Sequence, residues 1–137
     1  MATVYLTRKI TFCASHRLNS SQLSVEENKR IFGKCNNENG HGHNYTLEVT
    51  IKGEIDPKTG MVMNITDLRK IMDTHVADIM DHKHLNLDVE VFKTVNPTAE
   101  NMIVVIWKLL EPHLAKGQLF EVKLHETDNN TSIYRGE

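Results

Sequence analysis

Three histidines, His16, His41 and His43, stand at the neighbouring ends of two stretches in which apolar and polar residues alternate. Alternation of period two is typical of β-strands with one buried face. The first stretch covers residues 4–18 and the second residues 41–55, and both place their histidines on the apolar face. If the strands pair antiparallel, the three rings converge. Three imidazoles with an open fourth position are typical of catalytic zinc, so the pattern predicts a zinc-dependent enzyme.

Cys35 is a second candidate for chemistry. It lies in a loop rich in Gly, Asn and Lys, shortly before the histidine pair of the second strand. A nearby cation or base would favour its reactive thiolate form. From the residues alone, three interpretations stay open: a catalytic thiol, a small buried hydrophobe, or a fourth ligand that closes the zinc site. For the three histidines, the alternative is hydrogen bonding at the rim of a sheet.

Two carboxylates also suggest function. Asp81 and His82 are adjacent at a helix end, and a carboxylate that fixes the tautomer of a histidine can form an acid–base relay, although sequence neighbours often point apart. Glu126 takes the fourth place in the apolar row Phe120, Val122, Leu124. A core-facing carboxylate needs a partner. That partner is either a structural salt bridge or the paired N–H donors of a planar ligand.

The elements that must position these residues follow in the order ββααββ. The four expected strands cover residues 4–18, 41–55, 119–127 and 131–135. The two expected helices are one with apolar residues three and four apart between 68 and 79, and one that starts near Thr98. A short helical turn is expected at 25–31. We expect His75 in the core and His84 in solvent. Two apolar helix faces against one side of a four-stranded antiparallel sheet predict an α+β fold.

The bulk composition favours an ordinary globular protein. A length of 137 residues predicts one domain over 1–137. A net charge of −2 gives no reason to expect nucleic acid as a partner. Two cysteines are too few for a disulfide scaffold, and no stretch is long and apolar enough for a membrane span, so we expect a cytoplasmic protein. Open sheet edges favour a symmetric assembly.

Six segments resemble the 6-pyruvoyltetrahydropterin synthase family and cover nearly the whole chain in order. They are ITFCASHRL at 10–18, FGKCNNENGHGHNY at 32–45, GEIDP at 53–57, GMVMN at 60–64, DHK at 81–83 and ETDNN at 126–130. The resemblance implies the T-fold, in which ββααββ subunits join their sheets into a barrel. It also implies a homohexamer, a dimer of trimers, with active sites at subunit interfaces.

The resemblance also implies roles for individual residues. The matched positions are the zinc ligands His16, His41 and His43, the proton acceptor Cys35, its relay partners Asp81 and His82, the pterin anchor Glu126, and further pterin contacts at Thr98 and Glu100. Ala99 stands where relatives carry a second threonine, so one side-chain contact of the family is in question here, whereas a backbone contact would survive.

The activity implied by the resemblance is the zinc-dependent conversion of 7,8-dihydroneopterin triphosphate to 6-pyruvoyltetrahydropterin with release of triphosphate, in tetrahydrobiopterin biosynthesis. The substrate triphosphate has three candidate partners, Arg17, Lys34 and Lys83. One alternative is a 6-carboxytetrahydropterin synthase of deazapurine synthesis, in which the cysteine typically lies closer to the His-x-His pair than the five-residue gap, 36–40, found here. Another is a non-enzymatic, zinc-stabilised binding module.

Overall fold

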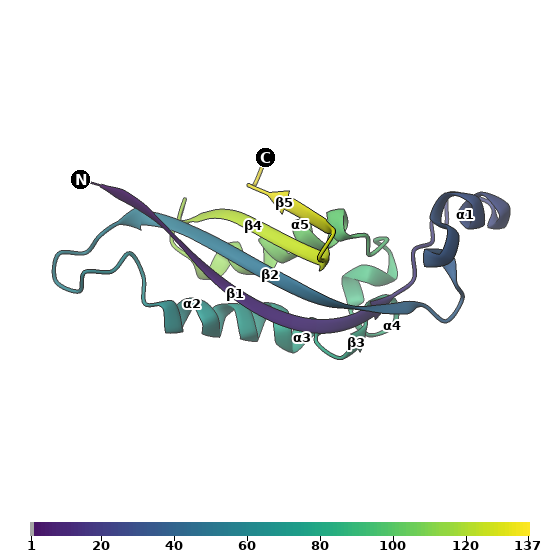
Figure 1. Cartoon of the computed structure of the whole chain (residues 1–137), viewed down its shortest axis with the longest axis horizontal. Helices are drawn as coiled ribbons and strands as arrows, with labels where there is room; N and C mark the ends of the chain where they lie inside the picture. The colour runs from purple at the N-terminus through teal and green to yellow at the C-terminus, as the bar shows by residue number, and fades with distance from the viewer. Residues whose placement is uncertain (1) are drawn as a thin grey trace.

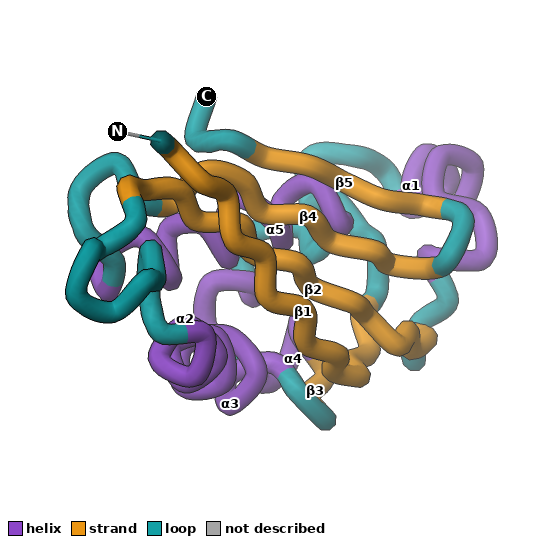
Figure 2. The backbone as a smooth tube through the Cα atoms, turned by 60° about the vertical axis from the view of Figure 1, so that its left-hand side comes forward, coloured by secondary structure: helices purple, strands orange, loops and turns teal. Residues whose placement is uncertain are grey.

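A twisted sheet forms one layer of the molecule, and its longest helices pack against one face (Figure 1). The computed structural model describes residues 2–137. The strands lie in the order β3-β1-β2-β4-β5, and Figure 2 shows them side by side in this order. Their bounds are β1 (Thr3–His16), β2 (His41–Glu54), β3 (Lys83–His84), β4 (Leu119–Thr127) and β5 (Asn130–Tyr134). The predicted order of the long elements, ββααββ, is confirmed.

One strand was not predicted. β3 is two residues long and runs parallel to β1, pairing Ala14 with Lys83 and Ser15 with His84. The sheet is therefore five-stranded and mixed, where the sequence predicted four antiparallel strands. The physical reason is a long-range contact: the loop after the first long helix is bonded to the free edge of β1, which would otherwise expose unpaired backbone groups.

The helices are of two kinds: longer helices that pack on the sheet, and short helical segments in the connections. Their bounds are α1 (Val25–Phe32), the 3-10 helix η1 (Gly33–Asn36), α2 (Ile65–Met72), the π-helical segment η2 (Asp73–Ala77), α3 (Asp78–Met80), α4 (Leu85–Asp88), the 3-10 helix η3 (Glu90–Lys93), α5 (Ala99–Leu110) and the 3-10 helix η4 (Glu111–His113). The turn predicted at 25–31 is thus a capped two-turn helix, in which Ser24 and Glu27 form a reciprocal capping box. No helix of residues 2–137 is long and apolar enough to cross a membrane.

The core lies between the sheet and the helices α2, α3 and α5. β1 and β2 pair antiparallel from Thr3↔Glu54 to His16↔His41, so their apolar rows meet on one face. The fully buried residues of the helices are Leu68, Met72, Val76, Met80, Leu85, Met102, Ile106 and Leu110. Full burial of such a side chain contributes about 1.5–3 kcal/mol, so this layer holds the long strands in place.

β4 departs from the predicted alternation at both of its ends. A register shift between Thr50 and Ile51 pairs Ile51 with Leu119, so Leu119 enters the core and Phe120 does not. The ring of Phe120 instead lies edge-on to Tyr5, at 4.7 Å between centroids. The prediction that Phe120 faces the core is therefore wrong, because a β-bulge adds one residue and reverses the faces before it.

Candidate active site

The antiparallel pairing of β1 and β2 brings the three histidines together as predicted. His16 and His41 are direct register partners, and His43 lies two residues further along the same face. Ring centroids are 4.7 Å apart for His16 and His41, 5.2 Å for His16 and His43, and 4.9 Å for His41 and His43. One ring nitrogen of each lies within 4.8 Å of the others. The residues can therefore share one metal ion.

His16 is the most strongly positioned member of this histidine triad. It is fully buried, and its Nδ1 lies 2.7 Å from the carbonyl oxygen of Pro97, to which it donates. This bond leaves Nε2 without a proton, and Nε2 faces Nε2 of His41 at 3.2 Å. A backbone carbonyl that orients an imidazole in this way is a common outer-shell feature of metal sites. The carbonyl comes from the residue before the N-cap of α5, so the helix layer orients the ring.

The electrostatics of the triad favour neutral rings. The pKa of His16 is lowered to about 4, mainly by burial; the bond to Pro97 opposes the shift, and the nearby His41, His43 and His84 add to it. Burial also lowers the pKa of His41, followed by the effect of His43, with Glu126 acting in the opposite direction. Neutral imidazole is the form that binds metals.

Unpaired nitrogen atoms give a direct test of whether this triad fits a metal. Among the described residues, Nδ1 of His41 and Nε2 of His43 are buried and have no hydrogen-bond partner. Nε2 of His16, which carries no proton, lies 3.2 Å from Nε2 of His41, so this contact needs either a proton on His41 or a cation between the two nitrogens. The donor set, three neutral imidazoles, suits zinc and other borderline divalent ions. The site therefore fits a divalent metal.

Glu126 lies beside the triad at a second bulge. The register of β4 against β5 shifts between His125 and Thr127, which leaves Glu126 as the extra residue; bulges often redirect a side chain in this way. Its Oε1 lies 3.9 Å from Nε2 of His43. The carboxylate also helps burial to raise the pKa of Tyr45. A half-buried carboxylate thus faces the same space as the metal-binding nitrogens.

Asp81 and His82 form a contact with each other and with β1. Nδ1 of His82 lies 2.9 Å from Oδ2 of Asp81, so this pair of sequence neighbours does interact. Oδ1 of Asp81 accepts a bond from the backbone N–H of Cys13 at 2.9 Å. This backbone bond is the main reason that the pKa of Asp81 is lowered; burial opposes the shift, and His82 lowers the pKa further. Asp81 is therefore an ionised partner for His82.

Cys35 does not join Asp81 and His82 within the chain. Its carbonyl accepts a bond from the N–H of Leu18 at 2.9 Å, and the buried Asn36 holds the loop through bonds of 2.8 Å to Leu18 O and 2.9 Å to Asn19 Oδ1. Asp81 is bonded to Cys13, five residues before Leu18. At about 3.3 Å per extended residue, that separation is roughly 16 Å along β1 and the two residues that follow it. The thiol that the described chain brings to Asp81 and His82 is Cys13.

Thr98 and Glu100 lie at the start of α5. Oγ1 of Thr98 accepts a bond from the N–H of Asn101 at 3.1 Å, so Thr98 is the N-cap. Glu100 is exposed in the first turn, and Ala99 is half-buried. Because Pro97 contacts His16, this end of α5 lies next to the triad. The structure thus places Thr98 near the site by its backbone, with its hydroxyl already engaged in capping.

The remaining histidines require two corrections. His84 was expected in solvent, but it is half-buried, and its Nδ1 is buried with no partner among the described residues. The short strand β3 carries it to the triad, where its Nε2 would lie 2.9 Å from a Cβ added at Gly40. His75 was expected in the core, but it is half-buried and stacks on the exposed His113 at 3.5 Å between centroids. The role of the Pro97 carbonyl had no signal in the sequence.

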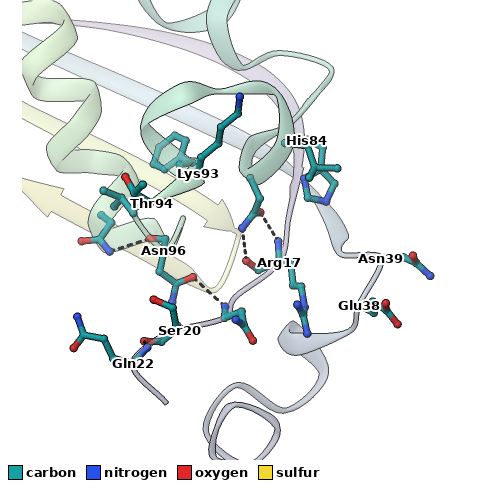
Figure 3. A pocket seen from close by; sticks show the side chains of 16 residues that line it. Arg17, Ser20, Gln22, Glu38, Asn39, His84, Lys93, Thr94 and Asn96 are labelled. Carbon is teal, nitrogen blue, oxygen red and sulfur yellow. Dashed lines mark hydrogen bonds between the residues drawn. The ribbon is translucent and has the colours of Figure 1, made fainter. Parts of the chain in front are cut away.

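Two hollows adjoin the triad. A pocket of about 800 Å³ is lined by residues that include Arg17, His84 and Lys93. Figure 3 shows Lys93, Thr94 and Asn96 on one side of it and Glu38 and Asn39 on the other, with Arg17 between them. A second hollow of about 570 Å³ is lined by residues that include Cys13, His43, His82 and Lys83. Of the candidates for the triphosphate, Arg17 and Lys83 therefore line hollows beside the triad.

Comparison with known proteins gives close relatives. The family profile described as 6-pyruvoyl tetrahydropterin synthase matches residues 5–137. A human protein named 6-pyruvoyl tetrahydrobiopterin synthase is 54% identical over 132 residues, which cover 96% of this chain and 91% of that protein. A Dictyostelium discoideum protein of the same name is 53% identical over 135 residues, covering 98% of each chain.

Solved structures agree with this relation. The structure of Caenorhabditis elegans 6-pyruvoyl tetrahydropterin synthase matches with a TM-score of 0.95 and 43% identity, over 100% of this chain and 98% of that one. A Plasmodium vivax 6-pyruvoyl tetrahydropterin synthase, 15% identical with a TM-score of 0.70 over 98% of each chain, shows likeness of fold alone. The α+β class and the T-fold expected from the sequence are confirmed. The chain belongs to the 6-pyruvoyl tetrahydropterin synthase family.

Proposed function

We propose that this chain converts 7,8-dihydroneopterin triphosphate to 6-pyruvoyltetrahydropterin with release of triphosphate, as a lyase of tetrahydrobiopterin biosynthesis. The observation that carries the proposal is the triad of His16, His41 and His43, in a member of this family, with the carboxylate of Glu126 only 3.9 Å from His43. A metal site and a carboxylate that share one space can hold the two ends of a pterin that carries a hydroxylated side chain.

Zinc is the ion that we assign to the triad. Neutral imidazoles are typical zinc ligands, and three of them leave the fourth position for a ligand or water. When bound, zinc would supply Lewis-acid polarisation of the substrate hydroxyls and so acidify the neighbouring C–H bonds. The contribution of the chain is orientation: Pro97 fixes the ring of His16, and the strand pairing fixes the other two.

Cys35, Asp81 and His82 would move protons at the side-chain carbons of the substrate. In this proposal the thiolate of Cys35 accepts the proton, and His82, with its tautomer fixed by Asp81, exchanges it with solvent. Within one chain, the points at which Cys35 and Asp81 are bonded to the first strand segment, Leu18 and Cys13, are roughly 16 Å apart. The relay therefore has to form between two copies, with Cys35 from one and Asp81 and His82 from its neighbour. This requirement supports an oligomer, for which we propose a homohexamer.

Glu126 is the residue that we assign to the pterin ring. Its carboxylate can accept two parallel bonds from the N–H edge of the ring, which fixes the position of the side chain near the metal. Thr98 and Glu100 would add contacts from the start of α5. The hydroxyl of Thr98 already caps the helix, and Ala99 offers no hydroxyl, so we expect the backbone of this turn to supply part of the contact.

The direct test is turnover of 7,8-dihydroneopterin triphosphate by the zinc-loaded protein. Triphosphate release and product mass are measured with and without a chelator. We expect 6-pyruvoyltetrahydropterin only when metal is present. His43→Ala should lose both metal and turnover, whereas His113→Ala, which replaces an exposed histidine away from the triad, should keep both. A 6-carboxytetrahydropterin product would instead identify the activity as that of a 6-carboxytetrahydropterin synthase of deazapurine synthesis. Absence of turnover would favour the non-enzymatic binding module.

Complementation tests the shared relay. Cys35→Ala and Asp81→Asn are each expected to be inactive alone. When equal amounts are unfolded together and reassembled, a site that takes Cys35 from one copy and Asp81 from another is intact in about one case in four, because each residue is native with a probability of one half. We expect about a quarter of the native activity. Activity that stays at the level of the single variants would place the whole relay within one chain.

A further inference from the structure

A second cluster of ligand-type side chains lies outside the histidine triad. It consists of Cys13 on β1 and the adjacent pair Asp81 and His82. Alternation along β1 turns Cys13 away from the core row that carries His16, so the cluster and the triad lie on different faces of the strand. We propose that Cys13, Asp81 and His82 form a second cation site, which takes a thiophilic divalent ion such as Cd²⁺ or Zn²⁺.

Three bonds hold the cluster together before any ion enters. The N–H of Cys13 donates to Oδ1 of Asp81 at 2.9 Å, and the N–H of His82 donates to the carbonyl of Cys13 at 2.6 Å. Nδ1 of His82 lies 2.9 Å from Oδ2 of Asp81. His82 is the one non-glycine residue of the described chain with a positive φ, at 63°, a conformation that few residues adopt without compensation. The backbone of this turn is therefore fixed against β1 in the geometry that faces its side chains toward Cys13.

The distances fit coordination. A thiol sulfur, a carboxylate oxygen and an imidazole nitrogen lie within 4.8 Å of one another. In a tetrahedral zinc site, neighbouring ligand atoms are roughly 3.3–3.8 Å apart, as follows from bonds of 2.0–2.3 Å. Small side-chain rotations close the difference. The imidazole of His82 is 80% exposed, so an ion can enter without opening the core, and the thiol proton leaves to solvent as the ion binds.

The donor set and its surroundings decide which ion is preferred. Thiolate and imidazole ligands favour zinc, cadmium and other soft or borderline ions over Mg²⁺ and Ca²⁺, which prefer oxygen ligands. Two further charged groups line the adjoining hollow, Lys83 and Asp88. Their charges are opposite in sign, so the preference among cations is set by the ligand atoms.

Occupancy of this site has a consequence for activity. An ion bound to Asp81 and His82 removes both residues from the proton relay, so excess thiophilic metal should inhibit turnover. This consequence rests on the proposed function, whereas binding of the ion does not. The two can therefore be tested separately.

The binding test is a Cd²⁺ titration of the zinc-loaded protein, followed by calorimetry and by ultraviolet thiolate-to-cadmium absorbance. The triad has no sulfur ligand, so exchange of cadmium into it gives no such absorbance. We expect one equivalent bound with the thiolate signal. Cys13→Ser should abolish the signal and weaken binding at least ~10-fold, and Cys13→Ala provides the same readout if the serine variant folds poorly. Cys35→Ser, which removes the other cysteine of the chain, is the matched control and should retain the signal.

Two outcomes would overturn the site: a thiolate signal that survives loss of Cys13, or one that disappears with Cys35→Ser. The activity arm gives an independent result. Cys13→Ser keeps the backbone N–H that holds Asp81, so it should turn over normally and resist cadmium. If cadmium binds through Cys13 without inhibition, the second site stands and the assignment of Asp81 and His82 to the relay falls.

Discussion

Acidification of the metal-free protein should reveal the cost of burying His16. The pKa of this ring is lowered from 6.5 to about 4. A group with a depressed pKa contributes stability that is fully present above its unfolded pKa and is lost as the pH falls to the folded pKa. The window therefore runs from pH 6.5 down to about 4. A gap of about 2.5 units at 1.36 kcal/mol per unit corresponds to about 3 kcal/mol of the free energy of unfolding. Because the ring is fully buried, solvent screening reduces this little.

Urea unfolding of chelated protein at a series of pH values, followed by the fluorescence of Trp107, measures this loss. The informative variant is His16→Asn, whose amide can replace Nδ1 as the donor to Pro97 but cannot titrate. We expect its stability to fall by about 3 kcal/mol less than that of the native chain across the window. His113→Asn, at an exposed position, is the control and should follow the native curve. Equal slopes for His16→Asn and the native chain would refute the argument that burial holds His16 neutral.

Four further changes test other parts of the site. Gly40→Ala should lower the free energy of unfolding, measured in urea, by about 1–3 kcal/mol more than Gly60→Ala does. Both glycines have positive φ, but only a Cβ at Gly40 would collide with a backbone oxygen, at 2.9 Å. Equal losses in the two variants would contradict this reasoning. Cys35→Ala should keep zinc and fold but lose turnover, and unchanged turnover would exclude the thiol as the base. His43→Ala should lose metal by elemental analysis, and full zinc content would remove it from the ligand set. Glu126→Gln should weaken pterin binding in titration far more than metal binding, and equal pterin affinity would rule out the anchor.

Much of the fold followed from local patterns. Alternation of period two located β1, β2 and β4, and it placed His16, His41 and His43 on one face, because a strand alternates its side chains regardless of context. Apolar spacing of three and four located the two long helices. Pairing of β1 with β2 then needed only the antiparallel arrangement that a connecting loop allows.

Other features of the site had no local signal. Sequence periodicity does not reveal a β-bulge. The burial of Leu119 and the unpaired position of Glu126 therefore depended on how β4 pairs with β2 and β5. His84 was expected in solvent for a similar reason, since nothing in its own segment showed that β3 would pair with β1. The single-domain, cytoplasmic and hexameric expectations stay predictions.

The sequence by itself determined which side chains share a face, and with it the convergence of the histidine triad, because residue spacing along a strand sets side-chain direction. Only the tertiary structure decided which distant groups meet. The bonds from His16 to Pro97 and from Cys13 to Asp81 join residues 81 and 68 positions apart. Contacts at such separations depend on how the helix layer packs against the sheet, which placed Cys13, and not Cys35, beside the acid–base pair.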